Sequence, residues 1–77
     1  MTTYTPAVCV YLATSKANFE IIRNQLLATL EKAAHNGDED NIKISQIQLD
    51  LVLRGLMAMN SHLERAKRER NETAQLN

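Results

Sequence analysis

The sequence predicts an all-α fold: an antiparallel helical hairpin of two long helices preceded by a short N-terminal helix. Two Gly and one Pro among 77 residues leave the chain few places to turn. Apolar residues recur at three- and four-residue spacing on both sides of Gly37, which is the helical period. Hydrophobic residues make up 44% of the chain but aromatic residues only 4%, so we expect an aliphatic core. This length fits one small helical domain over residues 1–77.

The first helix is expected to be short. Thr5 can act as its N-cap with Pro6 at the first helical position, where the missing N–H costs nothing. We therefore expect a helix over residues 6–13, although several β-branched and aromatic side chains of this segment favour extended structure locally. A second start at Thr14–Ser15 opens the first long helix, which should run from about Lys16 to Ala34.

The turn between the two long helices is well marked. Gly37 suits the left-handed conformation that closes many helices. Residues 38–41 then bring three carboxylates and an amide to the start of the next helix, where they cap it and complement its dipole. A loop of about five residues implies an antiparallel pair. We expect the second long helix from about Ile42 to near Glu69 and a frayed tail over residues 71–77.

The long helices carry more apolar surface than a hairpin can bury. The first has one stripe, formed by Phe19, Ile22, Leu26, Leu30 and Ala33. The second has a heptad stripe, which we expect to form a partner interface through Leu49, Val52, Leu56, Met59 and Leu63. An adjoining stripe is assigned to the contact within the hairpin, although the two roles can be exchanged; it contains Ile44, Ile47 and Leu51. Together the two stripes occupy roughly 200° of the helix circumference, more than one neighbouring helix covers.

Three kinds of cover for this surplus remain open. The N-terminal segment can fold back over it with Val8, Tyr11 and Leu12. A second copy can complete a four-helix bundle, or a groove of another protein can receive the helix. Gly55 and Ala58 favour the approach of another helix, because small side chains let two backbones come close.

Patterns typical of catalytic or metal sites are not found in the sequence. His35 stands at a helix end and His62 on the other helix, with no cluster of ligands around either. Cys9 lies among apolar residues without a neighbouring base, which is typical of a small buried hydrophobe. There is no nucleophile elbow and no phosphate-binding Gly loop. We expect neither an enzyme nor a metal or cofactor.

Charge and targeting signals favour a cytoplasmic protein. Nine Lys and Arg balance nine Asp and Glu, which removes the broad attraction to nucleic acids and anionic membranes. With no basic leader and no apolar run of about 18 residues, we expect no membrane insertion. A basic stretch near the C-terminus contains Arg65, Lys67, Arg68 and Arg70. Three glutamates interleave these four cations and leave a local charge of +1, so we expect no nucleic-acid site there.

Two segments carry a resemblance to a known family. They are Ile21-Ile22-Arg23-Asn24-Gln25-Leu26 on the first long helix and Leu53-Arg54-Gly55-Leu56-Met57-Ala58-Met59 on the second, on either side of an acidic turn that contains a Gly. This layout resembles the small YscE-like co-chaperones of bacterial type III secretion systems over residues 5–66.

The resemblance implies a non-enzymatic function. A YscE-like protein pairs with a larger helical-repeat chaperone, and the pair keeps the needle subunit monomeric in the cytosol before export. The alternative from the residues alone is a homodimeric four-helix-bundle regulator, with RNA as a candidate ligand of the basic stretch.

Overall fold

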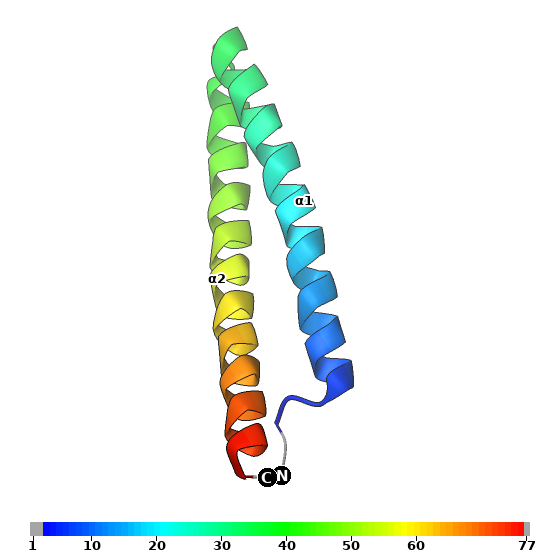
Figure 1. The fold of residues 1–77 in the computed structure, drawn as a ribbon. Coiled ribbons are helices and arrows are strands. Elements are labelled where there is room, and N and C mark those ends of the chain that lie inside the picture. The colour runs from blue at the N-terminus through cyan, green and yellow to red at the C-terminus, as the bar shows by residue number, and fades with distance from the viewer. Residues whose placement is uncertain (1–2, 77) are drawn as a thin grey trace.

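The computed structural model shows two helices that lie side by side and are joined at one end by a tight turn (Figure 1). It describes residues 3–76, with side chains through residue 72. Helix α1 spans Pro6–Asn36 and helix α2 spans Glu39–Leu76. No strand is present among the described residues, so the prediction of an all-helical chain is confirmed. The molecule is a thin rod, with extents of 60 × 15 × 15 Å.

Helix α1 begins where its capping residues predict. The Thr5 hydroxyl accepts a hydrogen bond from the backbone N–H of Val8 at 3.2 Å, and Pro6 occupies the first turn. The backbone carbonyl of Thr5 also accepts the N–H of Cys9 at 2.9 Å. The first bond satisfies an amide that has no partner within the helix, and the second is the first bond of the helical ladder, so the predicted N-cap is confirmed.

The predicted division of this region into a short helix and a second start at Thr14–Ser15 is not found. Helix α1 runs without a break through residues 13–16. Its inward positions Leu12, Lys16 and Phe19 keep one regular spacing across these residues, so packing against α2 does not require an interruption. The extended preference of Val8 and Val10 is a weak local bias, which the cap and the continuing helix override.

The turn is shorter than predicted. Only Gly37 and Asp38 separate the helices, because Asp38 both completes the end of α1 and caps α2. Gly37 has φ 68° and ψ 26°, and its N–H and that of Asp38 donate to the carbonyls of Ala34 and Ala33. This is a Schellman closure, for which a residue without a Cβ is favoured.

Asp38 then caps α2. Its carboxylate accepts the backbone N–H of Asn41 at 3.3 Å and the side-chain amide of the same residue at 2.6 Å. Glu39 and Asp40 lie in the first turn, where negative charge favours the helix dipole. Helix α2 continues to Leu76, into the segment for which a frayed tail is expected from the sequence, while residue 77 lies outside the described residues.

The two helices meet along one seam, in which inward residues alternate at three- and four-residue spacing on both partners. From α1 these residues are Cys9, Leu12, Lys16, Phe19, Arg23, Leu26, Leu30 and Ala33. From α2 they are Ile42, Ser45, Leu49, Val52, Leu56, Met59, Leu63 and Ala66. All sixteen are buried or half-buried, and the pattern is that of an antiparallel coiled coil.

The turn predicts a specific stability effect. Changing Gly37 to Ala should lower the free energy of unfolding by about 1 kcal/mol, because a Cβ is disfavoured at this positive φ although nothing lies within 4 Å of its position. Thermal and urea unfolding followed by circular dichroism would measure the loss. Gly37→Asn is the matched control and should lose less, because Asn tolerates the left-handed region. Equal stability of the Gly and Ala proteins would contradict this account of the turn.

Candidate interaction surface

The predicted partner interface lies inside the hairpin. Leu56 is 6% exposed, and the other four residues of that prediction are half-buried along the seam with α1; they are Leu49, Val52, Met59 and Leu63. The heptad stripe of α2 is therefore used within the chain. It is a better seam than its neighbour because it stays uncharged and mainly aliphatic through Ala66, along the whole overlap with α1.

The adjoining stripe is the one that faces solvent. Ile44, Ile47 and Leu51 are 52%, 56% and 61% exposed, whereas the sequence assigned them to the contact within the hairpin. The two roles are thus exchanged. The cause is visible in the sequence, because Arg54, Ser61 and Arg65 interrupt this side of α2 and leave the aliphatic stripe too short for a seam. Residues 6–13 do not form a lid over it, since Tyr11 is exposed and Leu12 is buried in the seam.

Gly55 serves the contact within the hairpin. A Cβ added there would lie 3.2 Å from Cε2 of the Phe19 ring, so the ring packs into the space that a larger residue would fill. From the sequence we expected Gly55 to favour the close approach of a helix from another molecule, whereas the helix that approaches it in the structure is α1 of the same chain. This contact also fixes which flank of the seam Gly55 lies on.

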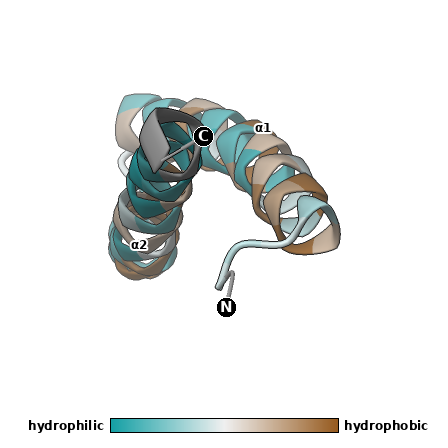
Figure 2. Cartoon of the chain, turned by 60° about the horizontal axis from the view of Figure 1, so that its bottom comes forward, coloured by the Kyte–Doolittle hydropathy of each residue, from teal (hydrophilic) through white to brown (hydrophobic). Residues whose placement is uncertain are grey.

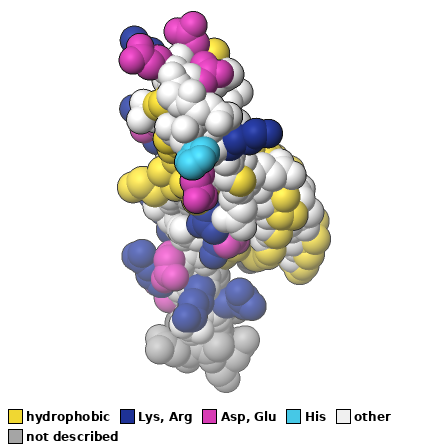
Figure 3. Space-filling model, turned by 90° about the horizontal axis from the view of Figure 1, so that it is seen from above, with side chains coloured by type: hydrophobic (Ala, Val, Ile, Leu, Met, Phe, Trp, Pro, Cys, Tyr) yellow, Lys and Arg dark blue, Asp and Glu magenta, His cyan; other side chains and the backbone are white. Residues whose placement is uncertain are grey.

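One flank of the hairpin is free of formal charge over most of its length. Heptad spacing places the residues on either side of Phe19 and Gly55 there: Ser15, Asn18, Ile22, Gln25 and Thr29 from α1, and Gln48, Leu51, Gly55, Ala58 and His62 from α2. We call this set the uncharged face. Lys32 and Arg65 bound it at its two ends. Figure 3 shows apolar side chains gathered at the molecular surface, apart from most of the charged side chains.

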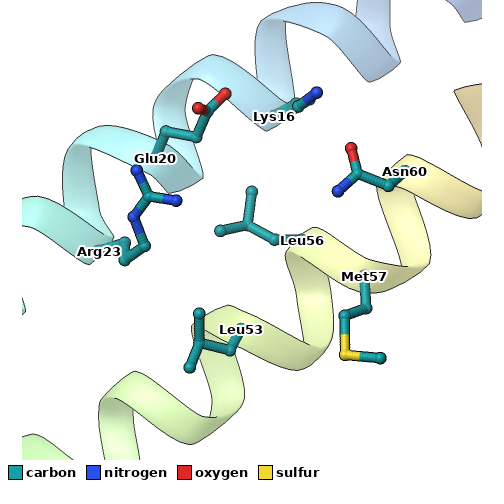
Figure 4. Close-up of a pocket in the computed structure, with 7 residues that line it drawn as sticks. All are labelled: Lys16, Glu20, Arg23, Leu53, Leu56, Met57 and Asn60. Atoms are coloured by element: carbon teal, nitrogen blue, oxygen red, sulfur yellow. The ribbon is translucent and has the colours of Figure 1, made fainter.

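The opposite flank is hollowed and charged. A groove of about 470 Å³ lies between the helices, and Figure 4 shows its lining of Lys16, Glu20, Arg23, Leu53, Leu56, Met57 and Asn60. Lys16 and Arg23 occupy seam positions of α1, but their long side chains carry the charge outward to solvent. The seam is therefore incompletely filled at these two levels, and the groove results from it. This groove was not predicted from the sequence, although the heptad spacing of α1 contained the signal.

At the open end of the hairpin, residues 3–5 cross back toward α2. The Tyr4 hydroxyl and Nδ1 of His62 are 3.0 Å apart in a hydrogen bond, and the Tyr4 backbone N–H donates to Oε1 of Glu69 at 3.3 Å. The Cys9 thiol is half-buried, with its sulfur 3.9 Å from the Tyr4 carbonyl oxygen. His62 thus takes part in a structural contact. Residue spacing contained no signal for it, because Tyr4 lies outside any helix.

The described residues were also compared with the patterns of metal sites and membrane spans. Within the part of the chain that the structure describes, no group of three or more His, Cys, Asp or Glu side chains could hold a metal ion. None of the described helices has an apolar stretch sufficient for crossing a membrane. The C-terminal part of α2 is hydrophilic (Figure 2), and its cations Arg65, Lys67, Arg68 and Arg70 lie among glutamates.

Comparison with known proteins finds no match to a family model, to a curated protein or to a solved structure. The guide to function is therefore the surface of the hairpin. Its main features are a charged groove beside the seam, an exposed aliphatic stripe on α2 and a lateral face without charge.

The exchange of the two stripes predicts that aspartate has different effects at Leu56 and Leu51. Leu56→Asp should abolish the helical circular dichroism signal, because an unpaired carboxylate in the seam costs several kcal/mol in a domain of marginal stability. Leu51→Asp should keep a helical signal close to wild type, since the side chain already faces water. Circular dichroism and thermal unfolding at low micromolar concentration would compare them. Equal loss of helix in both variants would contradict the assignment of the stripes.

Proposed function

We propose that the chain is a non-enzymatic interaction module that acts as a co-chaperone in bacterial type III secretion. In this function it pairs with a larger helical-repeat chaperone, and the pair keeps the needle subunit monomeric in the cytoplasm. The general part of the proposal rests on the exposed surface of the hairpin. The specific part rests on the resemblance to YscE-like proteins over residues 5–66.

The exposed aliphatic stripe of α2 is the observation that carries the proposal. Ile44, Ile47 and Leu51 each keep more than half of their surface in water, although α1 packs along the seam beside them. Burying a side chain of this size contributes about 1.5–3 kcal/mol. A contiguous apolar patch of this kind on a small protein marks an interaction site. Burying these three side chains against a partner would therefore contribute favourable binding free energy.

The geometry of the stripe favours a helical partner. Its three residues follow helical spacing along α2, which gives a straight ridge that fits between the ridges of another helix. The neighbouring Gly55 and Ala58 have small side chains, which leave room beside the ridge for side chains of a partner helix. A helical-repeat protein offers grooves between successive helices, and the absence of formal charge on these three residues calls for an apolar groove.

Partner recovery from the native host would test the proposal. Affinity purification of the tagged chain should recover a helical-repeat chaperone together with a needle subunit, identified by mass spectrometry. The double variant Ile47→Asp, Leu51→Asp should recover neither protein, because two carboxylates would be forced into an apolar contact. The matched control is Ser61→Asp, an exposed position on the same side of α2 but beyond the end of the aliphatic stripe, which should retain both. Recovery of neither protein class with the wild-type chain would contradict the secretion function.

The basic stretch allows the RNA-binding alternative to be tested separately. Changing Arg68 and Arg70 together to Gln should alter the free energy of unfolding by no more than about 1 kcal/mol, as expected for charges at a helix surface. Partner recovery should be unchanged. Titration of the wild-type chain with RNA at two salt concentrations should show no binding. A steep, salt-dependent isotherm that the double variant loses would instead establish a phosphate-binding site.

A further inference from the structure

We propose that, when no other partner is present, the uncharged face of one chain docks on the uncharged face of a second copy. The product is a four-helix bundle whose two-fold axis runs along the bundle, so that α1 of each chain lies on α2 of the other. The inference rests on the proposed function in one respect, because Leu51 belongs to both docking surfaces. It adds that a second copy of the chain occupies the uncharged face.

The exposed surface is large enough for such an occupant. A compact monomer of 8.7 kDa is expected to expose about 4,700 Å². This chain exposes 6103 Å², an excess of about 1,400 Å² over that expectation. Stable homodimers bury about 800 Å² or more on each partner. The excess on one hairpin is therefore sufficient for a dimer interface of ordinary size, with apolar residues exposed to fill it.

Charge determines which flank can meet a copy of itself. A two-fold interface buries each of its charges twice, so every charge needs an opposite charge at a matching place. The uncharged face needs no such pairing, because its polar residues, such as Asn18 and Gln25, are neutral. The opposite flank carries Glu20 and Asp50 among other charges. A formal net charge of zero also leaves no overall repulsion between copies.

Side-chain sizes select the orientation of the pairing. Gly55 and Ala58 are small, so the surface of α2 forms a shallow depression there. Phe19 packs against Gly55 from within the hairpin and leaves no cavity beneath it. Ile22 occupies the matching flank position of α1 and is 40% exposed.

An axis parallel to the helices places Ile22 of each chain on Gly55 of the other, which matches a large side chain to a low surface twice. An axis perpendicular to the helices would instead bring the two Ile22 side chains together and leave a gap between the two Gly55 residues. Close packing favours the first arrangement.

The ends of the face fit the same arrangement. Tyr11 on α1 and Arg65 on α2 both lie about 15 Å from the level of Ile22 and Gly55, toward the open end. The parallel axis therefore brings Tyr11 of each chain near Arg65 of the other, where the guanidinium can stack on the ring. At the turn end the same axis brings Ile44 near Lys32, whose aliphatic stem can cover it. Tyr11 and Ile44 are 69% and 52% exposed in the single hairpin, so both gain cover.

Sedimentation of the isolated full-length chain tests the inference. We expect a dimer for the wild type and a monomer for Leu51→Asp, with a dissociation constant raised at least about 100-fold. The matched control is Met57→Asp, since Met57 is 70% exposed on the opposite flank. It should remain dimeric, and circular dichroism should show both variants to be helical. A monomeric wild-type chain, or a Met57→Asp variant that dissociates like Leu51→Asp, would overturn the inference.

A disulfide experiment tests the proposed orientation. In a Cys9→Ser background, a Tyr11→Cys chain mixed with an Arg65→Cys chain should give a disulfide-linked dimer on mild oxidation, because the parallel axis brings these positions together between copies. A Tyr11→Cys chain mixed with a Lys32→Cys chain is the control and should not link efficiently, since only a perpendicular axis would pair those positions. The reverse result in a dimeric protein would overturn this packing. Failure to recover secretion partners from the host, with the dimer intact, would instead contradict the proposed function alone.

Discussion

The alternating three- and four-residue spacing on both helices is the constraint on which the structure depends. Each inward residue of α1 faces the α2 seam, so one regular pattern aligns the two helices from the turn to the open end. It leaves few deeply buried side chains, because a two-helix seam is only one layer thick. Leu12, Ala33, Leu56 and Ala66 are the hydrophobic side chains counted as buried among the described residues. A fold with so thin a core has a small free energy of unfolding, and its exposed apolar surface is correspondingly large.

The sequence predicted the start and end of α1 because these depend on local chemistry. Thr5 and Pro6 form a cap through neighbouring backbone groups, and Gly37 takes the left-handed conformation that glycine accepts without strain. The proposed break at Thr14–Ser15 failed for the opposite reason. Ser and Thr can cap a helix, but they also continue one when the packing on both sides keeps its register.

The candidate surface was less predictable than the fold. Both stripes of α2 and their excess width were predicted from the sequence, but the stripe that faces α1 was assigned wrongly. That choice depends on how far each stripe extends, and Arg54 and Arg65 end the exposed one early. The cations at Lys16 and Arg23 also obscured the heptad of α1. The Tyr4 contact with His62 joins segments far apart in sequence, so no local pattern indicated it.

The two-residue turn has a consequence for how the chain reaches this state. Residues next to Gly37 and Asp38 are close in sequence as well as in space, so their contacts close the smallest loops and cost the least chain entropy. Contacts farther from the turn close longer loops, and each benefits from those already made. The contacts of the hairpin are therefore expected to form in order from the turn toward Tyr4 and Glu69. Because most of them are close in sequence, the contact order is low and folding is expected to be fast. The last contacts to form are those at the open end, which would also be the first to separate.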